Sequence, residues 1–77
     1  MRNEHFIAVA CDVHGAEMAN GVTGDCIGVV IDESLVFWDG WDALYSIRVY
    51  HVTNDEDGNE VSEVVHEEYA KPQVILD

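Results

Sequence analysis

Residues 47–69, IRVYHVTNDEDGNEVSEVVHEEY, decide the fold that this sequence predicts. Two runs rich in β-branched and aromatic residues, 47–54 and 60–69, are the composition that strands favour. Between them, Gly58 can take the positive φ that a tight turn requires. We therefore expect a β-hairpin over this segment.

Two pairing registers are open for this hairpin. In the first, His51 lies opposite Glu63 and Arg48 opposite His66. A change of one residue in the loop pairs Arg48 with Glu67 instead. The first register also pairs Val49 with Val65. It places four apolar residues on one face, which we expect to belong to the core: Ile47, Val49, Val61 and Val65.

The N-terminal part of the chain predicts two further strands, at residues 5–13 and 26–32. The segment between them, residues 14–25, contains three glycines and small polar residues, which are typical of a loop with at most one short helical turn. The second strand contains Gly28, where we expect a bulge or a sharp bend.

Residues 35–44 have two interpretations. In one, they form a second hairpin across Asp39 and Gly40, which would bring Trp38 beside Trp41 as a cross-strand pair. In the other, Asp39 caps a short helix that runs to about Ser46. The density of aromatic and β-branched residues favours the hairpin.

Five or six short strands are expected in total, counting a last one at residues 73–76, after Pro72. The fold class is mainly β: a small, strongly bent antiparallel sheet or an SH3-like barrel, with room for one short helix. The strand-and-turn order of the chain resembles that of the SH3-like small barrels, with these segments in sequence: Gly24-Asp25, Gly28-Val29-Val30, residues 45–50, Asp57-Gly58 and residues 68–72. All 77 residues are expected to form a single acidic domain.

The net charge of −13, from 16 acidic against 3 basic side chains, is the most unusual property of the chain. Such a surface repels nucleic acid and anionic membranes, and it favours a basic protein as partner. A domain this small has a marginal core, so we expect a homodimer in which a second copy covers an exposed face. The segment 73–76 is a candidate edge for that pairing.

No apolar run is long enough to span a bilayer, and the N-terminus does not resemble a signal peptide, so a cytoplasmic location is expected. In a reducing cytosol, Cys11 and Cys26 are expected to be free, buried thiols.

The sequence contains no clear motif for a metal site or a catalytic site. If Gly58 were the glycine of an EF-hand loop, Val64 would occupy the position that needs a bidentate Glu. The paired short spacings of a structural zinc motif are also missing. We expect no cofactor, no metal and no enzymatic activity.

The acids of the hairpin are the candidate functional residues. Strand residues two apart point the same way about 6.8 Å apart, roughly two base-pair rises of DNA, so Glu63 and Glu67 are expected to lie in one row. The candidate partner-binding set is Asp39, Asp42, Asp55, Glu56, Asp57, Glu60, Glu63, Glu67 and Glu68. Adaptation of a small acidic domain to high salt, with a structural or interaction role, is the alternative.

With its small size, its high acidity and the hairpin sequence NDEDGNEVSEVVHEE, the chain resembles the small phage-encoded DNA-mimic inhibitors. It is similar in particular to those that occupy the DNA-binding site of the bacterial histone-like protein HU. The resemblance implies a dimeric, non-enzymatic inhibitor that acts in the host cytoplasm or nucleoid and displaces DNA from a basic protein. It assigns no individual site residue.

Overall fold

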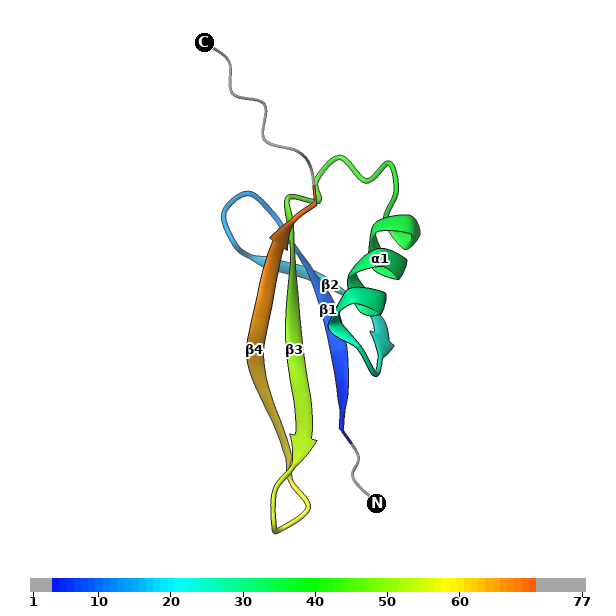
Figure 1. Cartoon of the computed structure of the whole chain (residues 1–77). Coiled ribbons are helices and arrows are strands. Elements are labelled where there is room, and N and C mark those ends of the chain that lie inside the picture. Colours follow the sequence, from blue (N-terminus) through cyan, green and yellow to red (C-terminus); the bar gives the residue numbers. More distant parts are fainter. Residues whose placement is uncertain (1–3, 71–77) are drawn as a thin grey trace.

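The computed structural model describes residues 4–70, which form four strands and one helix (Figure 1). The mainly β, antiparallel fold predicted from the sequence is confirmed, with fewer strands than the five or six expected. The predicted strand at residues 73–76 lies outside the described residues. In chain order the elements are β1 (His5–Cys11), β2 (Glu17–Gly24), α1 (Ile27–Phe37), β3 (Ser46–Asn54) and β4 (Glu60–Tyr69).

The strands form one antiparallel sheet in the order β2-β1-β3-β4. Strands β2 and β3 both run antiparallel to β1, so they are parallel to each other. Parallel strands need a long crossover connection, and α1 lies within the segment that supplies it. Of the two predicted arrangements, the described residues adopt the open sheet, with β2 and β4 as its edges.

The predicted hairpin is confirmed as β3 and β4. Each of the two predicted registers is found in one part of the hairpin, on either side of a register shift. Near the turn, His51 lies opposite Glu63; farther along, Arg48 lies opposite Glu67. The register shifts between Val49 and Tyr50, where β4 contains one extra residue, Val65. Such a bulge moves the following side chains to the other face of the strand.

The core lies between α1 and one face of the sheet. The inward side of the helix carries Val30 and Ile31, and these pack against Ala8 and Ala10 of β1 and against the apolar residues of β3. The small alanines leave room for a helix to approach the sheet closely. This packing, more than local propensity, stabilises an 11-residue helix.

The prediction of a strand at residues 26–32 is wrong, because residues 27–32 belong to α1. The loop predicted at residues 14–25 is also partly wrong, since β2 occupies most of it. The apolar residues Ile27, Val30, Ile31, Leu35 and Trp38 follow the helical spacing and point inward together. Their burial outweighs the strand preference of the valines and isoleucines.

Neither interpretation of residues 35–44 is correct, because α1 ends at Phe37 and the residues after it form turns. Gly40 does have a positive φ of 81°, as a turn requires. The indole rings of Trp38 and Trp41 do lie together, with centroids 6.0 Å apart, but they meet within this turn and not across two strands.

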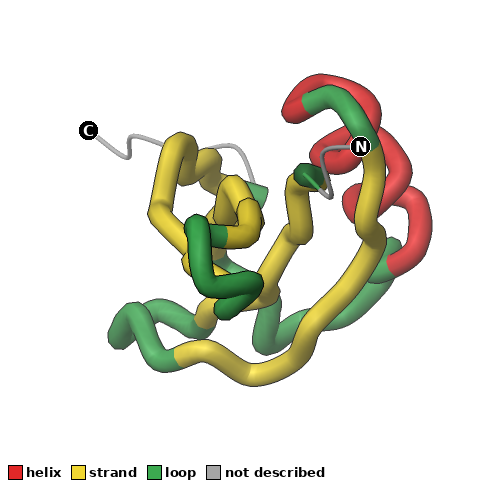
Figure 2. The backbone as a smooth tube through the Cα atoms, turned by 90° about the horizontal axis from the view of Figure 1, so that it is seen from below, coloured by secondary structure: helices red, strands yellow, loops and turns green. Residues whose placement is uncertain are grey.

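Two of the four residues predicted for the core of the hairpin are not buried. Val61 and Val65 of β4 are 46% and 41% exposed, whereas Ile47 and Val49 of β3 are buried. The reason is the position of α1, which packs over the β2 side of the bent sheet and leaves edge strand β4 uncovered (Figure 2).

The two cysteines are free, as predicted, but only Cys11 is buried and Cys26 is exposed. No helix within residues 4–70 is long and apolar enough to cross a membrane.

Candidate acidic interface

The end of the β3–β4 hairpin projects beyond the rest of the sheet. The last pair between β1 and β3 is His5 with Val52, so β3, the turn and the start of β4 continue past β1 (Figure 1). Within residues 4–70, β1 therefore does not flank this end of the hairpin.

The turn at this end is built by Asp55. Its Oδ1 accepts hydrogen bonds from the backbone N–H groups of Asp57, at 2.9 Å, and Asn59, at 2.8 Å. Its carbonyl oxygen accepts a third from Gly58, which has a φ of 83°. Asp55, predicted as a partner-binding residue, thus has a structural role in forming the turn.

Four exposed carboxylates around this turn pair with no described residue, and we call them the acidic tip: Glu56, Asp57, Glu60 and Glu63. Glu63 lies opposite His51, on the face of the sheet that α1 covers farther along. Glu60 lies opposite Asn54 on the other face. Negative charge is therefore available on both sides of the two-stranded ribbon.

The single row expected from Glu63 and Glu67 does not form. Glu63 faces His51 and Glu67 faces Arg48, and these two partners are an odd number of residues apart on β3. Because strand side chains alternate, the two carboxylates lie on opposite faces of the sheet. The extra residue Val65 in β4 causes the difference.

Glu67 is also held by a cation. Its Oε2 accepts a hydrogen bond from Nε of Arg48, at 3.1 Å, and Nη1 of the same arginine lies 3.1 Å from Oε2 of Glu17. Tyr50 donates its hydroxyl hydrogen to that same Glu17 oxygen. This cluster joins β2, β3 and β4, so Glu67 stabilises the sheet and is not free for a partner.

The cluster also changes the acidity of its members. The hydrogen bond from Tyr50, followed by that from Arg48, holds the pKa of Glu17 below its ordinary value. The same bond to Glu17 raises the pKa of Tyr50. Hydrogen bonds to a carboxylate favour its charged form. Sequence reasoning missed Glu17 because its strand was expected to be a loop.

Glu68, the next acid of the predicted set, lies 3.4 Å from the Nε2 atom of His66. Because His66 follows the bulge, both side chains are on the same face of β4. Glu68 therefore has a neighbour that carries positive charge when protonated, which sets it apart from the unpaired carboxylates of the acidic tip.

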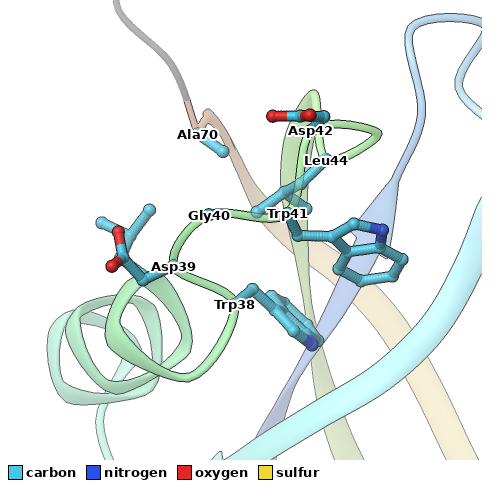
Figure 3. A pocket seen from close by; sticks show the side chains of 8 residues that line it. Trp38, Asp39, Gly40, Trp41, Asp42, Leu44 and Ala70 are labelled. Carbon is cyan, nitrogen blue, oxygen red and sulfur yellow. The ribbon is translucent and has the colours of Figure 1, made fainter.

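The two remaining predicted residues, Asp39 and Asp42, lie at the other end of the molecule, in the turns after α1 (Figure 1). They border a pocket of about 180 Å³ beside Trp38 and Trp41, and their carboxylates point away from both indole rings (Figure 3). Trp38 is buried and Trp41 half-buried. The predicted set therefore does not form one continuous surface.

Residues 4–70 contain no group of three or more His, Cys, Asp or Glu side chains placed to hold a metal ion.

No protein-family model, no curated protein and no solved structure matches this chain.

Proposed function

We propose that the protein is a non-enzymatic DNA mimic, which places its acidic tip in the nucleic-acid-binding groove of a basic host protein, such as the histone-like protein HU, and excludes DNA. The observation that carries this proposal is the set of unpaired carboxylates on a projecting hairpin. Arg48 is the only Lys or Arg between residues 4 and 70, and two carboxylates already neutralise it.

The physical basis is electrostatic complementarity. Carboxylates on both faces of a narrow ribbon meet the walls of a basic groove much as the two phosphate strands of a duplex do. Their field attracts a basic protein over long distances and raises the association rate, and salt weakens the complex. Charge-assisted hydrogen bonds between arginine and carboxylate then hold the complex together.

The test is competition for a DNA-binding protein. A fluorescent DNA duplex of about 20 base pairs is bound to HU, and the protein is added at increasing concentration. We expect it to displace the duplex. The variant Glu60→Gln/Glu63→Gln should need a concentration about tenfold higher, or more, to displace the duplex. The reason is that each lost charge-assisted bond contributes roughly 1.5–3 kcal/mol.

The matched control is Asp25→Asn/Asp39→Asn, which removes the same charge from two exposed residues outside the acidic tip. It should compete almost as well as the unmodified protein. Equal weakening by both variants would assign the effect to net charge and not to the acidic tip. Failure of the unmodified protein to displace DNA at micromolar concentration would exclude HU, and the same assay with other basic DNA-binding proteins would follow.

A further inference from the structure

The outer side of α1 exposes apolar residues that a small domain ordinarily buries. Val36 and Phe37 are 78% and 67% exposed, and with Val22 of β2 they line a shallow hollow of about 500 Å³. Asp32 and Glu33 complete its lining. We call these five residues the helix patch. Exposed apolar side chains grouped in this way, with a charged border, are typical of interaction sites.

The acids occupy a particular place in this patch. Asp32 is the central residue of α1, with the exposed Val29 about one turn before it and Val36 about one turn after it. These residues therefore follow one outer stripe of the helix in the order apolar, acidic, apolar. No described residue forms an ion pair or hydrogen bond with Asp32 or Glu33.

A second copy of the chain fits this surface poorly. In a symmetric dimer the same patch meets itself, so each copy brings its Asp32 and Glu33 to the interface. Four carboxylates would then share one interface, between two molecules that each carry a charge of −13. Like charges placed across an interface oppose association. The homodimer proposed from the small core would have to use another surface.

We propose that the helix patch binds a basic amphipathic helix of another protein. Its apolar residues would cover Val36 and Phe37, and Lys or Arg residues about one turn away would reach Asp32 and Glu33. Helix recognition of this kind uses apolar anchors at positions i, i+3, i+4 and i+7. Phe37 is the expected main anchor, because aromatic side chains dominate the energetics of such interfaces.

This interaction is separate from that of the acidic tip. The helix patch lies on α1 and the adjoining edge strand β2, whereas the tip is at the end of the β3–β4 hairpin (Figures 1 and 2). The patch also needs apolar contact, which a purely electrostatic DNA mimic does not. Binding at the two surfaces can therefore be distinguished by experiment.

The test uses two synthetic peptides of about 18 residues, both made of Lys and Leu in the same proportions. In one, the leucines follow the helical spacing and form a single stripe; in the other, the order is scrambled. We expect the amphipathic peptide to bind more tightly, as measured by fluorescence anisotropy. Phe37→Ser should weaken its binding about tenfold and should leave binding of the scrambled peptide unchanged.

Val13→Ser is the matched control, because Val13 is 62% exposed in the loop after β1 and belongs to neither surface. It should change neither affinity. The variant Glu60→Gln/Glu63→Gln should weaken both peptides to a similar, smaller extent. Phe37 is mostly exposed, so its replacement should preserve the fold, and Val36→Ser provides a second variant of the patch.

Equal affinity of the two peptides for the unmodified protein would overturn the proposal. An unchanged affinity of the amphipathic peptide for both variants, Phe37→Ser and Val36→Ser, would overturn it as well. Sedimentation of the unmodified protein and of Phe37→Ser measures whether each is a monomer or a dimer. A dimer that Phe37→Ser converts to a monomer would show that a second copy, and not a basic helix, occupies the patch.

Discussion

Among single residues, Arg48 connects three strands of the sheet. It contacts Glu17 on β2 and Glu67 on β4 from its own position on β3, so one cation spans three strands. Both carboxylates are partly exposed, which limits the stability that each ion pair contributes. The shared oxygen of Glu17, which also accepts the hydrogen bond from Tyr50, gives the cluster a defined geometry.

Replacement of Tyr50 by Phe should raise the pKa of Glu17 toward its ordinary value, because the hydrogen bond from Tyr50 is the main cause of the lowered pKa. A lowered pKa in the folded state stabilises the fold above the unfolded pKa of the group. That contribution is lost as the pH falls through the folded value. In Tyr50→Phe, this contribution to stability should therefore be smaller, and its loss on acidification should be complete at a higher pH.

Two measurements check this expectation: an NMR titration of the Glu17 carboxyl carbon, and thermal unfolding between about pH 3 and 6. Tyr45→Phe is the control, since Tyr45 packs edge-on against Tyr69 and has no contact with Glu17 among the described interactions. An unchanged titration of Glu17 in Tyr50→Phe would remove the hydrogen bond as the cause.

Between elements, the contact of α1 with β2 depends on a residue without a side chain. A Cβ atom built on Gly21 would come within 2.4 Å of the indole ring of Trp38. The buried Trp38 fills this space and holds the end of the helix against the edge strand. Any side chain at position 21 has to displace the indole ring of Trp38 from this space.

We therefore expect Gly21→Ala to lower the free energy of unfolding by about 1–3 kcal/mol through overpacking. Gly28→Ala is the matched control, because a Cβ atom there meets nothing within 4 Å. Since alanine is the better helix former, Gly28→Ala should raise the free energy of unfolding by roughly 0.5–1 kcal/mol. Urea unfolding of both variants measures the two changes, and a Gly21→Ala variant as stable as Gly28→Ala would contradict the packing described here.

Strand β4 shows how one residue redistributes charge over an element. Without Val65, the side chains of Glu63 and Glu67 would share a face, as a regular strand requires. The extra residue sends Glu67 to Arg48 and leaves Glu63 unpaired on the opposite face. The bulge thereby separates an acid that stabilises the sheet from those available to a partner.

For the molecule as a whole, the dominant force between distant groups is repulsion among carboxylates. The helix, the loops and the hairpin all carry acids, and the net charge is −13. Seven of the acids fall within residues 54–68, which contain no Lys or Arg. A surface adapted only to high salt is expected to be acidic more evenly, so the concentration on the hairpin favours a specific partner.

Salt dependence separates the two interpretations of this charge. We expect the protein to be folded in dilute buffer and its melting temperature to rise with KCl, levelling off above about 0.3 M as the repulsion is screened. Circular dichroism at salt concentrations from about 10 mM to 2 M checks this. A chain that is unfolded in dilute buffer and folds only in molar salt would support the halophile alternative.

The sequence was sufficient to predict the β3–β4 hairpin and its acidity, because alternation, β-branched residues and a turn glycine are local properties of the chain. It did not predict α1, although Ile27, Val30, Ile31, Leu35 and Trp38 have helical spacing. The exposed Val29, Val36 and Phe37 obscured that period, and β-branched residues favour strands. Helix formation here depends on burial against Ala8 and Ala10, which lie far away in the sequence.

For the candidate interface too, one part follows from the sequence and another part only from the tertiary structure. That the hairpin is acidic follows from its residues alone, but which carboxylates are free follows from their tertiary neighbours. Glu67 is neutralised because Arg48 lies across the ladder, and Glu17 joins them because residues 17–24 form a strand. Charge is a property of each side chain, whereas pairing requires that the fold bring two distant side chains within a few ångströms.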